Sequence, residues 1–308
     1  MTTTTPDTVT SPATDAATGL REGYAEIGEG ELHYVEAGDG PLVVLLHGFP
    51  EFWYGWRQQI APLVKAGFRV VAPDLRGYNL SSRPDGYAAY TADKLAGDIR
   101  GLIRELGAES AMVVGHDWGG TVAWTLAANH PEVVDRLVIL NAAHPRRLNE
   151  GLRNLRQLLR TWYFFYFQFP RLPERRARRR HWRFFKRFLR DARPPYTAEE
   201  IDRYVDAWSQ PGAAKAMIDY YRAAVRLSSK QGELRPVSAP TLVIWGQGDR
   251  YLGPNLAEPH HDDVPSLDRV ERLPNASHWV HQDEAERVNE LLVDFFAAAR
   301  RSENDRMT

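Results

Sequence analysis

Short blocks of apolar residues alternate along the chain with longer segments in which apolar positions recur at helical spacing. Each block is rich in β-branched residues and ends at Gly, Asp, Asn or His. Five such blocks occur, at 41–48, 68–74, 110–116, 135–141 and 240–246. Because these blocks are continuously apolar and do not alternate with polar residues, they predict parallel strands that are covered on both faces.

Two longer segments, 91–106 and 283–300, have the three- and four-residue spacing of amphipathic helices. Thr91 opens the first of them and is a candidate N-cap. Residues 30–38 predict an opening antiparallel strand. Together, strands alternating with helices predict an α/β fold with a mostly parallel, doubly wound sheet.

The alternation stops between residues 146 and 236. This segment contains aromatic residues, prolines and many arginines but no strand-like block, so it predicts a helical lid inserted above the sheet. The predicted organisation is a disordered tail (1–20), a first part of the core (21–145), the helical lid (146–236), a second part of the core (237–300) and a short tail (301–308).

Within the predicted lid, residues 171–190 contain ten Arg or Lys and one Glu. Such a run is typical of a solvated helix face whose aromatic residues pack inward. The alternative is a surface that binds an anionic partner. Neither interpretation gives this stretch a catalytic role.

Composition narrows the class of protein without identifying it. The 308 residues are 43% hydrophobic, with 39 basic and 40 acidic side chains, so the overall charge does not indicate a nucleic-acid or membrane partner. The absence of cysteine excludes disulfides and thiol nucleophiles. Residues 1–20 lack the features of a signal peptide, and no apolar run reaches the roughly 20 residues that span a bilayer. We therefore expect a cytoplasmic protein with no nucleic-acid or membrane partner, for which a homodimer is possible.

The candidate chemistry begins at VVGHDWGGTVAW, residues 113–124. Asp117 stands between a predicted strand and a helix that begins near Gly119, with further glycines at 115 and 120. A nucleophile elbow needs closely placed glycines, because this strained turn leaves no room for neighbouring side chains. An aspartate that only caps a helix would not need all three. Asp117 is therefore the candidate nucleophile, at the carboxyl ends of the strands, where open α/β sheets bind ligands.

A triad of this kind has the chain order nucleophile, acid, base. Asp249 follows the predicted strand 240–246 and is the candidate acid, whereas Asn141, at the end of another strand, cannot serve as one. His278 and His281 are both available as the base. We prefer His278 because it lies in a loop after a strand-like segment, whereas His281 is almost inside the last helix.

Two backbone N–H groups are candidates for an oxyanion hole. Phe49 lies in a turn that follows a predicted strand, and this turn can aim its N–H into the site. The N–H of Trp118, directly after the nucleophile, points the same way. Two such donors would stabilise a negatively charged oxygen during acyl transfer.

Five motifs occur in one order along residues 23–300: HGFPEFWYGW, PDLRGYNLSSRP, VGHDWGG, WGQGDRYLG and SHWVHQDEAERVN. In these motifs the chain resembles the α/β-hydrolase fold family and, within it, the epoxide hydrolases. The resemblance implies two functional lid tyrosines. It puts them at Tyr163, in RTWYFFYFQFPRLPE, and at Tyr221, in MIDYYRAAVR, with Tyr166 and Tyr220 as alternates.

A carboxylate nucleophile is suited to sp³ carbon. Its attack on an ester would give an anhydride, whereas displacement at an sp³ carbon gives an alkyl ester on Asp117. Water activated by His278 can then hydrolyse that ester. A departing epoxide oxygen needs a proton, which a phenol can donate, although the lid tyrosines could also serve packing alone.

These features predict an epoxide hydrolase that acts without a cofactor. No metal is expected, because neither a His-rich strand end nor a carboxylate cluster with ligand spacing occurs near Asp117. The substrate is predicted to be an apolar aryl or alkyl epoxide, because its expected contacts are aromatic. These contacts are Phe49, Trp118, Phe164 and Phe167.

Two other functions remain open at this point. Haloalkane dehalogenases resemble the chain around DWGG and bind halide through tryptophan N–H groups, for which Trp118 and Trp162 are available. However, Phe49 stands where one dehalogenase type has Asn, and tyrosines have no role in halide departure. A non-catalytic ligand receptor on the same fold is the second alternative, which the complete set of Asp117, Asp249 and His278 disfavours.

Overall fold

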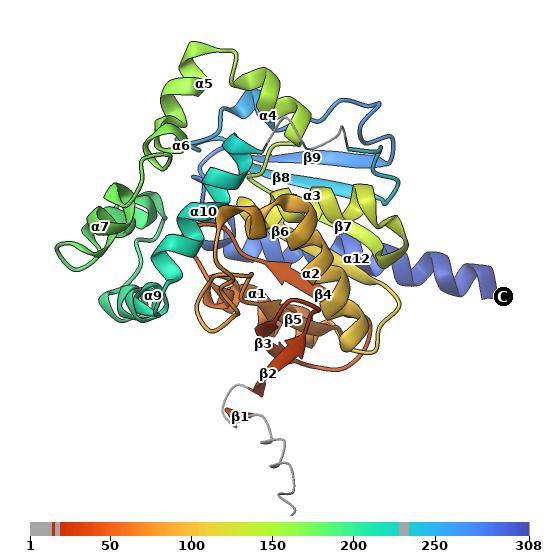
Figure 1. Ribbon diagram of the computed structural model, residues 1–308. Helices are drawn as coiled ribbons and strands as arrows, with labels where there is room; N and C mark the ends of the chain where they lie inside the picture. Colours follow the sequence, from red (N-terminus) through yellow and green to blue (C-terminus); the bar gives the residue numbers. More distant parts are fainter. Residues whose placement is uncertain (1–13, 16–18, 228–233, 308) are drawn as a thin grey trace, which may run out of the picture.

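The computed structural model of the protein describes residues 14–15, 19–227 and 234–307. Nine strands form one sheet in the order β1-β2-β3-β5-β4-β6-β7-β8-β9 (Figure 1). They are β1 (Thr14–Asp15), β2 (Leu20–Glu26), β3 (Glu31–Ala37), β4 (Leu42–Leu46), β5 (Arg69–Pro73), β6 (Ala111–His116), β7 (Val134–Leu140), β8 (Thr241–Gly246) and β9 (Leu267–Leu273). The pairs β1–β2, β2–β3 and β3–β5 are antiparallel. All other neighbours in the sheet, from β5–β4 to β8–β9, pair parallel. All five predicted parallel strands are therefore confirmed, as β4 to β8.

Alternate residues of the central strands face two different layers of helices. Val44 and Leu46 of β4 belong to the apolar core that also contains α2 (Ala92–Glu105) and α3 (Trp118–Asn129). Val43 and Leu45 belong to the core that contains α1 (Arg57–Lys65) and α12 (Ala285–Met307). Because helices cover both faces, both sets of side chains must be apolar, which explains the continuously apolar blocks in the sequence.

Between β7 and β8 the described residues form helices, turns and loops but no strand. These helices are α4 (Pro145–Gly151), α5 (Leu155–Arg160), α6 (Trp162–Tyr166), α7 (Leu172–Arg178), α8 (Arg183–Lys186), α9 (Ala198–Ser209) and α10 (Ala213–Arg226), with the 3₁₀ turn η4 (Phe188–Asp191). Figure 1 shows them gathered at one side of the sheet. We call them the inserted helices.

Hydrogen bonds connect the inserted helices to the loops at the carboxyl ends of the strands. Trp208 of α9 donates its indole N–H to the carbonyl of Pro50, after β4, at 2.6 Å. Tyr220 of α10 donates its hydroxyl to the carbonyl of Arg76, after β5, at 2.6 Å. The inserted helices therefore lie over the edge of the sheet at which α/β folds place their sites.

The two ends of the chain differ from the prediction. Thr14–Asp15 pairs with β2 as a short strand inside the segment 1–20 predicted to be disordered, while residues 1–13 and 16–18 lie outside the described residues. Strand β2 was not predicted, since its residues, which are exposed or partly buried except for Ala25, give no continuous apolar block. At the other end, helix α12 continues through the predicted tail 301–308 to Met307.

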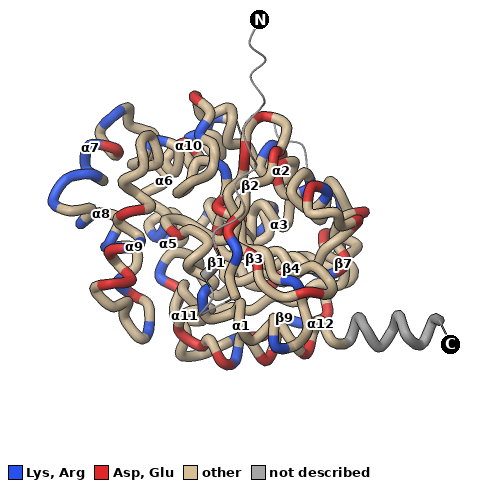
Figure 2. Tube along the Cα trace, turned by 90° about the horizontal axis from the view of Figure 1, so that it is seen from below, with Lys and Arg blue, Asp and Glu red and all other residues tan. Residues whose placement is uncertain are grey.

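The arginine-rich stretch 171–190 is not one helix. Helices α7 and α8 are separated by a turn in which Arg180, His181 and Trp182 have positive φ, a conformation that interrupts a helix. The prediction that its aromatic residues pack inward is confirmed, because Phe185 and Phe188 are buried while the arginines are exposed. Figure 2 shows the basic positions of α7 and α8 on the outside of the molecule. No described helix is both long and apolar enough to cross a bilayer.

Candidate active site

Asp117 occupies the turn between β6 and α3. Its φ of 51° and ψ of −116° are strained for a residue with a side chain. The turn is crowded: a Cβ on Gly119 would lie 2.1 Å from the carbonyl oxygen of Leu46, and one on Gly120 would lie 2.3 Å from Ala142 Cβ. The glycines are thus needed for close approach, as the elbow prediction requires. The N-terminus of α3 directly follows Asp117 and favours its negative charge.

The predicted acid and base lie beside this elbow. His278 Nδ1 is 2.7 Å from Asp249 Oδ2, and His278 Nε2 is 3.6 Å from Asp117 Oδ2. The side chains of His278 and Asp249 are buried, whereas the Asp117 side chain is 18% exposed. The structure therefore brings together all three predicted triad residues, with the candidate nucleophile Asp117 as the accessible member.

Charge determines the protonation of His278. Burial alone would lower its pKa, but the carboxylates of Asp249 and Asp117 raise the pKa to about 10. The same contact helps hold the pKa of Asp249 below its ordinary value, although burial opposes this. With Asp117 ionised, His278 is therefore an imidazolium at neutral pH.

Asn141 supports the acid instead of replacing it. Its Nδ2 donates to Asp249 Oδ2 at 2.8 Å, and its Oδ1 accepts from the N–H of Gly246 at 2.8 Å. The other oxygen of Asp249 accepts the N–H groups of Tyr251 and Leu252 at 2.7 and 2.9 Å. Asp249 thus has a fixed orientation toward His278, an arrangement that sequence reasoning missed.

The two predicted oxyanion-hole donors lie next to Asp117. The N–H of Phe49 donates to Asp117 Oδ1 at 2.8 Å. Trp118 is the first residue of α3, a position whose N–H has no acceptor within the helix. Gly48 allows the close approach of the Phe49 loop, because a Cβ there would lie 2.5 Å from Asp117 Cβ.

The two predicted lid tyrosines lie next to each other, and the charge of Asp117 acts on both. The ring centroids of Tyr163, on α6, and Tyr221, on α10, are 5.6 Å apart. Burial, reinforced by the charge of Asp117, raises the pKa of both phenols well above the ordinary value. Both hydroxyls are therefore protonated at neutral pH, and the negative charge of Asp117 helps to keep them so.

The alternate tyrosines are placed differently. The hydroxyl of Tyr220 is already bound to the Arg76 carbonyl at 2.6 Å. Tyr166 packs its ring against Phe184, away from the triad, with a ring separation of 5.6 Å. The geometry thus favours Tyr163 and Tyr221.

The aromatic residues predicted to contact substrate surround the same phenols. The ring of Tyr221 lies 5.2 Å from Phe49, 5.1 Å from Trp118, 5.0 Å from Phe164 and 4.8 Å from Phe167. All are buried or partly buried. The surroundings of Asp117 are therefore apolar and aromatic on the side of the inserted helices.

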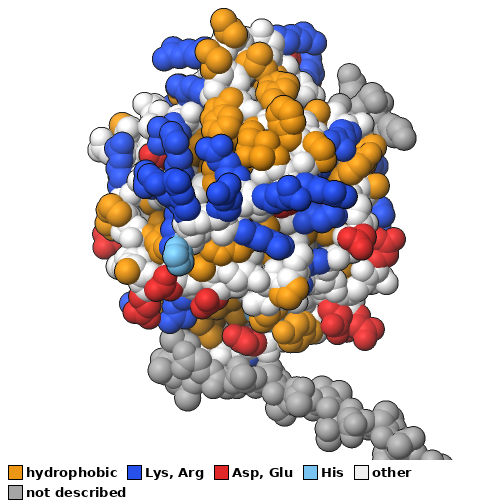
Figure 3. All heavy atoms as spheres, turned by 60° about the vertical axis from the view of Figure 1, so that its left-hand side comes forward, with side chains coloured by type: hydrophobic (Ala, Val, Ile, Leu, Met, Phe, Trp, Pro, Cys, Tyr) orange, Lys and Arg blue, Asp and Glu red, His pale blue; other side chains and the backbone are white. Residues whose placement is uncertain are grey.

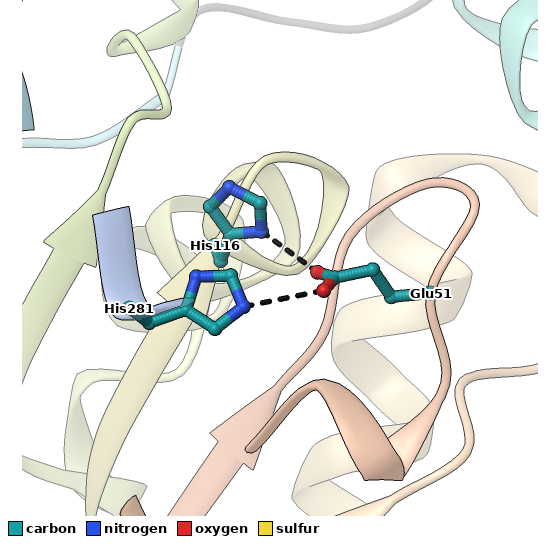
Figure 4. Close-up of side chains that lie close together, drawn as sticks. All are labelled: Glu51, His116 and His281. Atoms are coloured by element: carbon teal, nitrogen blue, oxygen red, sulfur yellow. Dashed lines mark hydrogen bonds and ion pairs between the residues drawn. The ribbon is translucent and has the colours of Figure 1, made fainter. Parts of the chain in front are cut away.

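A buried cluster behind the triad was not predicted. The carboxylate of Glu51 faces two neighbouring histidine rings, with its oxygens 3.0 Å from His116 Nδ1 and 3.2 Å from His281 Nε2 (Figure 4). Burial disfavours ionisation of Glu51, but His281 and His116 hold its pKa well below the usual range. These atoms lie close enough together to hold a metal ion. The expectation that no ligand cluster occurs near Asp117 is therefore wrong, because the three residues are far apart in sequence.

His116 connects this cluster to the triad. Its Nδ1 faces the Glu51 carboxylate, and its Nε2 lies 2.9 Å from the carbonyl oxygen of His278. The His116 ring therefore links the Glu51 carboxylate to the backbone of His278 through its two nitrogens. The cluster thereby holds the backbone of the candidate base.

The chain is similar to known proteins over most of its length. The family described as alpha/beta hydrolase fold matches residues 41–285. The chain is 43% identical to the AB hydrolase superfamily protein YfhM of Bacillus subtilis, over 86% of this chain and 93% of that protein. It is 36% identical to Epoxide hydrolase 4 of Homo sapiens, over 86% of this chain and 75% of that protein.

Solved structures give the same picture. A Bacillus megaterium epoxide hydrolase, determined with an inhibitor, has a TM-score of 0.82 at 32% identity, covering 89% of this chain and 100% of that one. Epoxide Hydrolase A from Mycobacterium thermoresistibile has a TM-score of 0.79 at 31% identity, covering 90% and 98%.

Proposed function

The chain belongs to the α/β-hydrolase fold family and, within it, to the epoxide hydrolases, and we propose that it converts an apolar epoxide to a vicinal diol through an ester on Asp117. The inserted helices act as the lid of this site. The aromatic residues around Tyr221 favour an apolar substrate, since they offer a large apolar surface and few polar groups.

The first step is alkylation of Asp117. Its Oδ1 is held by the N–H of Phe49 at 2.8 Å, so Oδ2 is the oxygen that attacks. As the Oδ2–carbon bond forms, one C–O bond of the epoxide breaks, and the ring oxygen takes a proton from Tyr163 or Tyr221. Burial keeps both phenols protonated until that moment.

The second step is hydrolysis of the ester. His278 takes a proton from a water molecule, which attacks the Asp117 carbonyl carbon, and negative charge develops on Oδ1. The N–H groups of Phe49 and Trp118 stabilise this charge, a contribution typically worth about 10²-fold or more in rate per donor. The tetrahedral intermediate collapses, and the diol oxygen leaves with a proton from His278. The new carboxyl group of Asp117 then passes its own proton to His278, which regenerates the carboxylate and the imidazolium of the resting enzyme.

The charge of Asp117 coordinates the two steps. In the resting enzyme this charge helps to raise the pKa of His278 to about 10. Alkylation removes the charge, so the pKa of His278 falls and its proton can pass through solvent to the phenolate left by the first step. Ester formation thus converts His278 into the base that the second step needs.

The observation that carries the proposal is a carboxylate at the elbow with two buried phenols beside it. A halide needs no proton on departure, so dehalogenation would leave Tyr163 and Tyr221 without a task. A receptor would need neither the pair His278–Asp249 nor an accessible nucleophile.

The proposal is tested by trapping the ester on Asp117 in a variant that cannot hydrolyse it. His278→Gln should accumulate an adduct equal in mass to one substrate molecule, located on the peptide that contains Asp117. Asp117→Asn, as the matched control, should show no such adduct at first. Release of halide from a haloalkane, without turnover of styrene oxide, would instead assign the protein to the dehalogenases.

A further inference from the structure

A groove lined by arginines runs across the outer surface of the inserted helices. It has a volume of about 660 Å³ and also contacts Leu172 and Phe184. Its arginines are Arg175, Arg176, Arg179, Arg180, Arg183, Arg187 and Arg190. We call this surface the arginine groove.

Acidic side chains of the protein do not neutralise the arginine groove. Glu174, the acidic residue inside the stretch, binds Arg222 at 2.7 Å. Asp191, directly after it, binds Arg250 at 2.6 Å. Among the residues that the structure describes, none of the seven groove arginines forms an ion pair. The groove therefore presents an uncompensated positive charge to solvent.

Exposed apolar side chains lie beside the groove. Six of the nine large apolar side chains that are strongly exposed in the described part of the chain occur between residues 155 and 172. They are Leu155, Leu159, Trp162, Phe165, Phe169 and Leu172. They lie on α5, on α6, in the bend that follows α6 and at the start of α7. Grouped exposed apolar residues mark an interaction surface more often than scattered ones do.

The apolar residues and the arginines form one surface. The guanidinium of Arg176 lies 5.8 Å from the ring centre of Tyr166 and 5.4 Å from that of Phe184. The Tyr166 ring in turn contacts Trp162 at 5.9 Å and Phe169 at 6.4 Å. Figure 3 shows basic and apolar side chains side by side on this face.

We propose that this face docks the protein on the surface of an anionic phospholipid bilayer. Arginines bind the lipid phosphates, and the adjacent Trp, Phe and Leu side chains enter the boundary between headgroups and acyl chains. A nucleic acid or an acidic peptide would use the arginines but leave the apolar side chains exposed. The sequence predicted no membrane partner because its net charge is close to zero. A net charge is a sum over the whole surface and does not show a local basic patch.

The docking face is the outer side of elements whose inner side forms the candidate active site. On α6, Tyr163 is buried toward Tyr221, whereas Trp162 and Phe165 are 49% and 53% exposed. On the proposed function, an apolar epoxide dissolved in the bilayer would thus lie one helix away from Asp117. The docking itself does not depend on the reaction.

The test is sedimentation of the full chain with vesicles of phosphatidylcholine, alone or mixed with phosphatidylglycerol. We expect binding to the mixed vesicles only. The variant Arg179→Gln/Arg183→Gln/Arg187→Gln should bind about a hundredfold more weakly, since each surface cation contributes roughly fivefold. The control Lys65→Gln/Arg104→Gln/Arg269→Gln also removes three positive charges, but from the sheet and the helices that cover it, and it should bind like the native protein.

A second variant distinguishes a bilayer from an acidic macromolecule. Leu159→Ser/Phe169→Ser keeps every charge and should still lose most vesicle binding, whereas the control Tyr24→Ser/Leu80→Ser should not. Thermal unfolding, which is independent of catalysis, establishes that each variant is folded. Equal binding of the native protein to both vesicle types, absence of binding at low salt, or full binding by either docking-face variant would overturn the proposal.

Discussion

Replacing the two lid phenols by phenylalanine isolates the proton that an epoxide needs. Tyr163→Phe and Tyr221→Phe keep the rings, which pack against Phe49, Phe167 and Phe188, and remove only the hydroxyls. General acid catalysis is typically worth about 10²–10⁴-fold. Since the ring centroids are 5.6 Å apart, either hydroxyl can serve the same oxygen. We therefore expect each single variant to alkylate Asp117 roughly tenfold more slowly, and the double variant about 10³-fold more slowly.

The assay is a single turnover with enzyme in excess, quenched at intervals and analysed by mass for the ester on Asp117. Hydrolysis of ester already formed should change much less, because no epoxide oxygen departs in that step. If the double variant forms ester at the native rate, the phenols are not the acid and the reasoning fails. Full-speed release of halide by the same variant would then identify a dehalogenase.

Three further predictions concern stability, protonation and metals. Gly119→Ala should destabilise the fold by roughly 1–3 kcal/mol in denaturant unfolding, because its Cβ would lie 2.1 Å from a backbone oxygen; Gly97→Ala, which meets nothing within 4 Å on α2, should instead stabilise it by about 0.5–1 kcal/mol. The pKa of His278 in the folded protein, about 10, lies above its ordinary value of 6.5. Its protonation therefore stabilises the fold fully below about pH 6.5, and this stabilisation is lost as the pH rises through about 10. The difference in unfolding free energy between the native protein and His278→Gln should shrink across that pH range, and a constant difference would contradict the prediction. Epoxide turnover should survive exhaustive chelation, because His116 Nδ1 and His281 Nε2 are already hydrogen-bonded to Glu51. If chelation abolishes turnover and one added metal restores it, the cluster around Glu51 is a metal site.

The parallel sheet could be predicted from sequence because burial on both faces forces continuously apolar strands. The same physics explains why β2 was missed: only Ala25 of this strand is buried, and Tyr24 is 56% exposed. The sequence of the inserted helices contains no strand-like block, and the prediction that this segment is helical is confirmed. Their short lengths and the break at residues 179–182 could not be predicted, because they depend on packing against the site.

In the candidate site, local sequence patterns found residues that the fold brings together, but they missed groups that come from distant parts of the chain. Asp117 could be located from its glycines, and His278 and Asp249 from chain order. The cluster joins Glu51 of the loop after β4, His116 at the end of β6 and His281 of the short helix α11 (Val280–Asp283), so no local pattern reveals it. Asn141 was recognised as unable to act as an acid, but its hydrogen bond to Asp249 required the fold.

The central claim is that Asp117 supplies an oxygen to the product. A single turnover in heavy-oxygen water, with enzyme in excess, tests this directly. We predict a first diol without the label, because its new oxygen comes from Asp117, and one labelled oxygen in the peptide that contains Asp117. A labelled first diol together with an unlabelled peptide would show that water attacks the epoxide directly, and would contradict the covalent mechanism.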